Sequence, residues 1–486
     1  MHPLVRPLIA VALVTLEGVI PSRVFAGMTP PEVRIFEDYK AKAETGDANS
    51  QFNLGACYFE GVGVSKDLAQ AISFFHKAAE KGHPMAQEGL GRCYTFGIGV
   101  SKDYAQAAKW YLKAANQGSS DAQFLLGLCY FEGMGLQKDY AQAVEWFRKA
   151  ADRGNSDAQF YIGVCYFKGA GVTEDYAQAA TWYRMASEHG NANAQFELGH
   201  CYLEGKGVPM NPVQGVSWYR KAAEQGNPDA QTNLGLCYFQ GIGVDKDYTL
   251  GLAWYQKAAA EGNAVAQFNI GVSYEKGLGV PQDYLQAVSW YRKAAEQEEP
   301  MAQTNLGICY LKGLGVPKDV SLAASLFRKA AGKGFSFAQY NLGTCYENGE
   351  GVLKDPLQAV SWYMKAAEQG NAAGQNNLGA CYEKGVGVKR DYVQAVSWYR
   401  KSAEQGTAQA QSNLGGCYLA GDGVMKDEIE AYAYWSLAAP SFADARTNLT
   451  LLEKSLAPAS RLRAQQRTKE LQKEIEAKIA AKKAGK

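Results

Sequence analysis

The sequence predicts an all-α solenoid built from eleven helix-turn-helix repeats of 36 residues. A glycine recurs at that spacing eleven times without an insertion, from Gly55 to Gly415. Each interval holds two segments with the apolar period of an α-helix, separated by Gly-rich loops. The composition is globular, with 47% hydrophobic and 20% charged residues. Because each repeat buries its apolar face on its neighbours, a chain of 486 residues needs no division into separate cores.

The N-terminus has the features of a secretory signal. Arg6 gives a positive start, residues 8–16 form a short apolar run, and Val24-Phe25-Ala26 fits a cleavage site. The run is shorter than an ordinary membrane span. We therefore expect residues 1–26 to be a signal peptide and the mature protein to be exported, either to the bacterial periplasm or as a secreted protein.

The third repeat shows what each position does. Its first helix, A, covers residues 121–132 and carries Ala122, Leu126 and Cys129 on one buried arc. Gly127 lies beside that arc and lets the second helix, B, approach closely. Paired glycines form the loop that follows, and helix B covers residues 139–152.

Helix B begins with a sequence typical of a capping box. Asp139 can accept hydrogen bonds from the first backbone N–H groups of the helix, and Gln142 can reach back to the N–H of Asp139. The same D-x-x-Q spacing recurs in six further repeats. We therefore interpret this row of acidic residues as helix caps rather than as an array of binding sites.

The two ends depart from the repeat, as solenoid ends should. Residues 27–48 contain a lone helix that resembles helix B, and the repeats occupy residues 49–441. We expect a capping helix over residues 442–458, because Pro458 ends the helical pattern. Residues 459–486 form a basic tail with nine Lys or Arg and three Glu, and we expect a polar helix there without an apolar stripe.

The repeat pattern resembles a known family. Residues 158–190 show it in the order Ile162-Gly163, Tyr166, Gly169-Ala170-Gly171-Val172, Asp175, Ala179, Trp182-Tyr183 and Gly190. This pattern is similar to the Sel-one-like repeat, a relative of the tetratricopeptide repeat. The resemblance implies a right-handed superhelix of antiparallel helix pairs, with the A helices on its concave side. It also implies a non-enzymatic scaffold or adaptor that binds a protein partner, whose identity the sequence does not give.

Ten cysteines in an exported protein would ordinarily suggest disulfides. Here each stands at the same repeat position, and the seventh repeat has Ser273 instead. Equivalent points on stacked helices lie about 8–10 Å apart, whereas the Cα atoms of a disulfide lie within about 7 Å. We therefore expect buried free thiols. A cysteine-rich branch of the family has two cysteines per repeat and is linked to β-lactam binding, so the alternative function, a β-lactam- or cell-wall-interacting protein, is the weaker hypothesis.

The sequence shows no pattern typical of a catalytic, metal-binding or phosphate-binding site. The five His stand in no nucleophilic or metal-ligating arrangement, and no Gly-rich loop continues as a phosphate-binding loop. The sequence therefore predicts no catalytic residue, no metal and no cofactor. A net charge of +1 gives no reason to expect nucleic acid as a partner. The basic tail could contact cell-wall polymer or an anionic surface, although a solvated terminal helix is the commoner meaning of such a segment.

The face of helix A away from the core stripe is the candidate partner surface. Aromatic residues recur there in the N-terminal half of the array: Phe124, Phe131, Phe160, Phe167, Phe196 and Phe239. Two interpretations are open, packing between repeats or an apolar groove for a segment of the partner.

An asparagine recurs beside that face: Asn53, Asn233, Asn269, Asn305, Asn341, Asn377 and Asn413. In tetratricopeptide relatives, asparagines of this kind hold the backbone of a bound peptide. Hydrogen bonds between repeats would explain them equally well.

Overall fold

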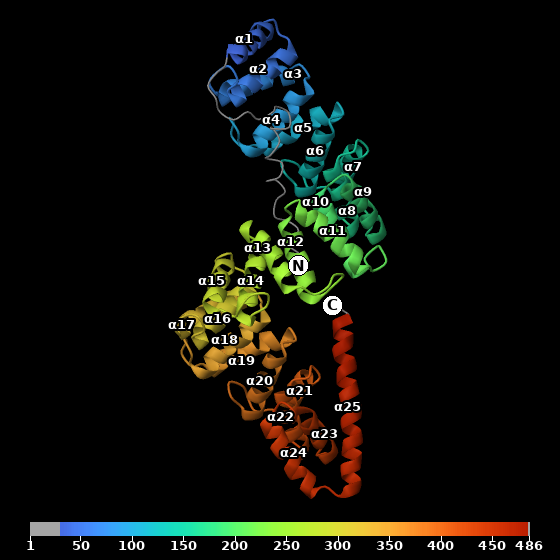
Figure 1. Cartoon of the computed structure of the whole chain (residues 1–486), viewed down its shortest axis with the longest axis vertical. Coiled ribbons are helices and arrows are strands. Elements are labelled where there is room, and N and C mark those ends of the chain that lie inside the picture. Colours follow the sequence, from blue (N-terminus) through green and yellow to red (C-terminus); the bar gives the residue numbers. More distant parts are fainter. Residues whose placement is uncertain (1–29, 485–486) are drawn as a thin grey trace. The chain divides into compact units, whose positions relative to one another are not determined.

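The computed structural model describes residues 30–484, so the expected signal peptide lies outside the described residues. This part of the chain forms 25 α-helices and contains no strand (Figure 1). It divides into two compact units, the first ending at Lys246 and the second beginning at Asp247. The prediction of an all-α solenoid of paired helices is confirmed, and each unit is described by itself below.

The first unit holds twelve helices. It begins with α1 (Pro30–Glu44), which lies within the segment expected to cap the array. Its A helices are α2 (Ala48–Glu60), α4 (Pro84–Phe96), α6 (Ser120–Glu132), α8 (Ser156–Lys168), α10 (Ala192–Glu204) and α12 (Pro228–Gln240). Its B helices are α3 (Leu68–Glu80), α5 (Tyr104–Asn116), α7 (Tyr140–Ala151), α9 (Tyr176–Glu188) and α11 (Pro212–Glu224).

The second unit holds the remaining helices. Its A helices are α14 (Ala264–Lys276), α16 (Pro300–Lys312), α18 (Ser336–Asn348), α20 (Ala372–Lys384) and α22 (Ala408–Ala420). Its B helices are α13 (Tyr248–Ala260), α15 (Tyr284–Glu296), α17 (Val320–Gly332), α19 (Pro356–Glu368), α21 (Tyr392–Ala403) and α23 (Glu428–Ala438). The unit ends with α24 (Ala443–Ser455) and α25 (Pro458–Ala484).

The recurring glycine of helix A permits the close contact within each helix pair. A Cβ atom on Gly127 of α6 would lie 2.6 Å from the ring of Phe147 on α7, closer than real side chains approach. Phe147 is fully buried, so its ring has no free space into which to move. The expectation that this glycine lets helix B approach is confirmed by this geometry.

The N-terminal caps of the B helices show only one half of the capping box that the sequence predicts. Asp139 Oδ1 accepts from the backbone N–H groups of Ala141 at 2.9 Å and of Gln142 at 3.0 Å. The expected return bond from the Gln142 side chain is wrong, because the N–H of Asp139 is already donated to the carbonyl of Tyr130 at 3.0 Å. A backbone bond across the A–B loop therefore replaces half of the capping box.

Buried glutamines tie each repeat to the one before it. Gln87 Nε2 on α4 donates to the carbonyl of Ala79 on α3 at 3.0 Å, and its Oε1 accepts from Gln117 Nε2 at the end of α5 at 2.7 Å. The same arrangement joins Gln225 to Gln195, Gln297 to Gln267, Gln369 to Gln339, and Gln405 to Gln375. We call this series of bonds the glutamine ladder. It satisfies polar groups that would otherwise be buried without partners.

The glutamine ladder is incomplete where the second glutamine is replaced. The buried Oε1 atoms of Gln51, Gln123, Gln231 and Gln303 have no hydrogen-bond partner in the described part of the chain. The residue thirty positions on is Lys81, Arg153, Glu261 or Lys333, instead of glutamine. Lys81 donates to the Gly46 carbonyl and Lys333 pairs with Glu298, so both lysines turn away from the ladder.

Completing the ladder should stabilise the protein. We expect Arg153→Gln to raise the free energy of unfolding by about 1 kcal/mol, because a buried unpaired acceptor on Gln123 gains a donor. Denaturant unfolding of the full chain measures the change. Arg153→Met is the matched control, since it has similar length and no donor. An equal gain from Arg153→Met would show that the hydrogen bond is not the cause.

Helix α24 carries a residue that would block a further helix pair. Asn448-Leu449-Thr450 of α24 matches Asn413-Leu414-Gly415 of α22, so Thr450 stands where the other A helices carry glycine. A Cβ atom at Gly415 would already meet the Trp435 ring at 2.8 Å. A helix B could therefore not approach α24 as it does in the repeats, and α25 packs on α23 instead.

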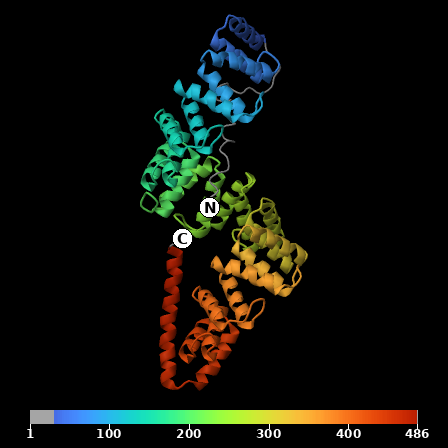
Figure 2. The same ribbon diagram turned by 180° about the vertical axis from the view of Figure 1, so that it is seen from behind.

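The expectation that the basic tail lacks an apolar stripe is wrong. Ala464, Leu471 and Ile475 are buried at 0%, 4% and 6% exposure in clusters that include residues of α23. Figures 1 and 2, which view the chain from opposite sides, both show α25 running beside α23. Arg467 Nε lies 2.6 Å from Glu430 Oε1, and Lys478 Nζ lies 2.7 Å from Glu404 Oε1. The tail is therefore an integral closing helix of the second unit.

Candidate functional site

The structure buries two of the aromatic residues expected to line a groove. Phe131 and Phe160 are 7% and 5% exposed, so their assignment to an open partner surface is wrong. Phe131 packs edge-on against Tyr161 of the next repeat, with ring centroids 5.6 Å apart. Phe160 packs against Tyr183, with centroids 5.8 Å apart. Phe131 therefore faces the junction with the next repeat, and Phe160 packs against helix B of its own repeat. A pattern within one helix cannot show either contact.

The other four phenylalanines are half-buried. Phe124 packs against Phe147 and Tyr161, and Phe167 packs edge-on against Tyr176. Phe196 stacks on Tyr219 with centroids 5.4 Å apart. Phe239 is half-buried on α12. Packing within and between repeats therefore explains most of the ring surface of Phe124, Phe167 and Phe196.

The asparagines on helix A make bonds between repeats at several junctions. Asn305 Nδ2 on α16 donates to the hydroxyl of Tyr291 on α15 at 3.2 Å. Asn233 and Asn377 make the corresponding bonds to Tyr219 and Tyr363. Asn341 instead donates to the carbonyl of Phe337 on its own helix at 2.8 Å, because Phe327 stands where the tyrosine would be. Asn53 and Asn269 are half-buried.

A carboxylate completes this network in the second unit. Tyr291 donates its hydroxyl proton to Glu275, and Tyr363 donates to Glu347 Oε2 at 2.5 Å. Tyr399 donates to Glu383 Oε2 at 2.7 Å. Burial, reinforced by the bonds to these carboxylates, raises the pKa of all three tyrosines, so each hydroxyl remains a donor at every physiological pH.

Polar and apolar residues are matched in part of the repeats, because Tyr183, Tyr219 and Tyr255 have the apolar Phe167, Leu203 and Phe239 at the position of the glutamate. Where helix B carries Phe75, Phe147 or Phe327, the position of the glutamate holds Phe59, Phe131 or Leu311. Where helix B carries Tyr111, that position holds Thr95, whose Oγ1 lies 2.9 Å from the tyrosine hydroxyl. A buried hydroxyl costs stability unless it is paired. These residues are therefore junction residues, and their burial leaves little of them for a partner.

A more exposed apolar surface lies on three consecutive A helices of the second unit. The first turns of α14, α16 and α18 carry Val265, Met301 and Phe337, where α6 and α8 carry Asp121 and Asp157. Val265 is 39% exposed and Phe337 is 60% exposed. Val272 and Ile308 lie two turns further along and are half-buried.

We call these five residues the A-helix patch: Val265, Val272, Met301, Ile308 and Phe337. Helices α16 and α18 contact one another directly. Sequence reasoning missed this patch, although comparing one position across all repeats would have found it. The exposed Lys276, Lys312 and Lys384 stand at the C-terminal ends of A helices in the same unit.

Other candidate chemistry is missing from residues 30–484. No group of three or more His, Cys, Asp or Glu there is placed to hold a metal ion. All ten cysteines are free and buried, and burial raises the pKa of thiols such as Cys93 to about 12, which keeps them protonated and unreactive. Within the same range, no helix combines the length and the apolar character that a membrane span requires.

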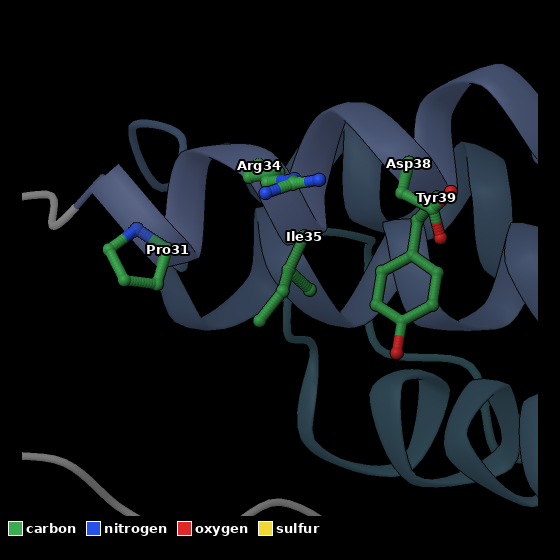
Figure 3. Close-up of a pocket in the computed structure, with 5 residues that line it drawn as sticks. All are labelled: Pro31, Arg34, Ile35, Asp38 and Tyr39. Carbon is green, nitrogen blue, oxygen red and sulfur yellow. The ribbon is translucent and has the colours of Figure 1, made fainter.

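A shallow hollow lies beside α1. Pro31, Ile35 and Tyr39 lie along one side of that helix, next to Arg34 and Asp38 (Figure 3). In a complete repeat the positions of Ile35 and Tyr39 are held by residues such as Ala143 and Phe147, both fully buried by helix A. Ile35 is 47% exposed. The hollow therefore marks the side of α1 on which a complete repeat would carry its helix A.

Comparison with known proteins identifies the repeats. The model of the Sel1 repeat family matches eleven segments: 48–83, 84–119, 120–155, 156–191, 192–227, 228–263, 264–299, 300–335, 336–371, 372–407 and 408–439. The chain belongs to the Sel1 repeat family. The expected family is therefore confirmed.

Two solved Sel1-type structures resemble this Sel1 protein. The crystal structure of c5321, a protective antigen present in uropathogenic Escherichia coli strains displaying an SLR fold, is 40% identical and has a TM-score of 0.74. That match covers 93% of this chain and 97% of the other. A Sel1 repeat protein from Oxalobacter formigenes is 33% identical over 68% of this chain and 99% of its own, with a TM-score of 0.52. No curated protein sequence matches the chain.

Membership of the family gives the general function. Sel1-repeat solenoids are typically scaffolds for protein–protein interaction rather than enzymes. The described surfaces of this Sel1 protein offer apolar and charged side chains to such an interaction.

Proposed function

We propose that this Sel1 protein is an exported scaffold that holds a partner protein on the A-helix patch. The observation that carries the proposal is the row of apolar residues at one position of α14, α16 and α18, where Val265 is 39% exposed, Phe337 is 60% exposed and Met301 is half-buried. Large apolar side chains are costly to leave in water, and neighbouring ones commonly mark interaction sites.

Three exposed lysines at the C-terminal ends of α14, α16 and α20 indicate the chemistry of the partner. Lys276, Lys312 and Lys384 make no ion pair within residues 30–484, so their charges are available to a ligand. A partner segment that combines apolar side chains with Asp or Glu would fit both features. We propose an extended or helical segment of this kind, laid across the A helices.

Capture of the partner from cells tests the proposal. We expect tagged protein, crosslinked mildly in its native cells, to retain a specific protein that Val265→Ser/Met301→Ser/Phe337→Ser loses by tenfold or more. The matched control is Leu285→Ser/Leu357→Ser/Val393→Ser, which removes residues that are 71%, 71% and 65% exposed on the first turns of B helices. Equal capture by both variants would overturn the assignment of the patch.

Export is tested in the same experiment by fractionating the cells before capture. The signal-like residues 1–26 support export, and they predict that tagged protein is recovered in the periplasmic or secreted fraction. Recovery in the cytoplasmic fraction alone would contradict this part of the proposal and leave the partner assignment standing.

A further inference from the structure

One buried side chain in the described part of the chain is an acid without a partner. Glu197 on α10 is 5% exposed, and every other buried polar side chain in residues 30–484 is uncharged. Neither a hydrogen bond nor an ion pair to its carboxylate is found within that range. Charged residues are rarely buried in this way, because removing an unpaired charge from water costs several kcal/mol.

Glu197 occupies a junction position that is neutral elsewhere. The equivalent residues of the sixth and eighth repeats, Asn233 and Asn305, each bond to a tyrosine of the preceding repeat. An amide side chain at this position gives the tyrosine hydroxyl a hydrogen-bond partner that carries no charge. The acid therefore adds nothing that the fold requires and carries a cost that the sister junctions avoid.

The groups around Glu197 come from every element packed against it. They are Lys168 on α8, Tyr183 on α9, Cys201 and Glu204 on α10, Tyr219 on α11 and Asp229 on α12. Burial, opposed by Lys168 and reinforced by Asp229 and Glu204, raises the pKa of Glu197 to about 7. The Glu204 charge is itself shared with His200 Nε2 at 3.2 Å and Lys206 Nζ at 2.6 Å.

We propose that Glu197 makes the junction between the fourth and fifth repeats respond to pH. In acidic solution the neutral carboxyl stays buried and the junction is closed. In neutral and alkaline solution the carboxylate favours conformations in which α9 and α10 separate and water reaches it. The fourth and fifth repeats would then be the point at which the first unit loosens as the pH rises.

The direction follows from proton binding. In the opened or unfolded junction the carboxyl titrates near its ordinary value of 4.5, and in the closed junction it titrates near 7. The closed form therefore retains a proton that the open form loses between these values. The stability of the junction is complete below pH 4.5, falls as the pH rises to 7, and changes little above it.

The buried cysteines report on this opening. Cys165 and Cys201 are 0% and 1% exposed in the fourth and fifth repeats, and Cys345 lies in the second unit as an internal reference. We expect the labelling rate of Cys201 relative to Cys345 to increase on the order of 10²-fold between pH 5 and pH 8, with Cys165 following it. Dividing by Cys345 removes the pH dependence of thiol reactivity itself. Mass spectrometry of each labelled peptide gives the ratio.

Two variants and two controls decide the outcome. Glu197→Gln and Glu197→Asn should keep the ratio constant across this range, and the asparagine is the residue that neighbouring repeats already carry. Glu224→Gln, at an exposed acid on α11, should leave the dependence unchanged. A constant ratio in the unchanged protein, or an equal increase in Glu197→Gln, would overturn the proposal. An equal increase at Cys93 in the second repeat would show that the whole first unit opens, which also contradicts a local junction.

Discussion

Gly163→Ala should lower the free energy of unfolding by about 2 kcal/mol, although alanine is the better helix former. A Cβ atom at Gly163 on α8 would lie 2.6 Å from two atoms of the Tyr183 ring and 3.3 Å from the Ala179 carbonyl. Tyr183 is 1% exposed, so its ring cannot move without displacing its own neighbours. The strain should therefore exceed the gain of about 1 kcal/mol from helix propensity. Denaturant unfolding and calorimetry measure the change.

Gly89→Ala is the matched control for this substitution. Gly89 is also a helix A glycine of the first unit, but a Cβ atom there would meet nothing within 4 Å. We expect this variant to gain about 0.5–1 kcal/mol, so the two substitutions should have opposite signs. If both stabilise the protein, close helix contact is not what requires Gly163.

Removing residues 459–486 should destabilise the second unit by several kcal/mol. The deletion takes away the buried Leu471 and Ile475, each worth about 1.5–3 kcal/mol, and uncovers α23. We expect a lower melting temperature for the second unit and new binding of a dye that detects apolar surface. The ion pair of Lys478 contributes little, since that side chain is 55% exposed.

Point variants in α25 test whether its buried side chains or its charges account for the loss of stability. Leu471→Ser/Ile475→Ser should reproduce most of the loss caused by the deletion, whereas Leu462→Ser, at a residue that is 69% exposed, should be nearly neutral. A shortened chain as stable as the full one would mean that α25 is a solvated tail after all.

The repeat architecture could be predicted because the residues that define it lie close together in the sequence and recur in each repeat. Gly127 and Asp139 have the same roles in every copy, so a period of 36 residues exposes both the close helix contact and the cap. The family and the one-cysteine-per-repeat core follow from the same periodicity.

The candidate site could be predicted only in part, because its surfaces depend on neighbouring repeats. Phe131 lies on the outer arc of its own helix, yet Tyr161 of the following repeat covers it. The stripe of α25 escaped notice because Ala464, Leu471 and Ile475 are sparse among charged residues in the sequence. The exposure of Phe337 and the isolation of Glu197 likewise emerge only when the helices are packed together.

The glutamine ladder has a consequence for how the length of such an array can change. Each rung joins a glutamine to the residue thirty positions on within one repeat, and to a backbone carbonyl eight positions back. A duplication or loss of one 36-residue copy leaves every rung with the same kinds of partner on both sides. The number of repeats can therefore change without requiring a new kind of contact between neighbouring repeats. The condition is that a tyrosine such as Tyr291 still contacts a polar residue and a phenylalanine such as Phe327 still contacts an apolar residue.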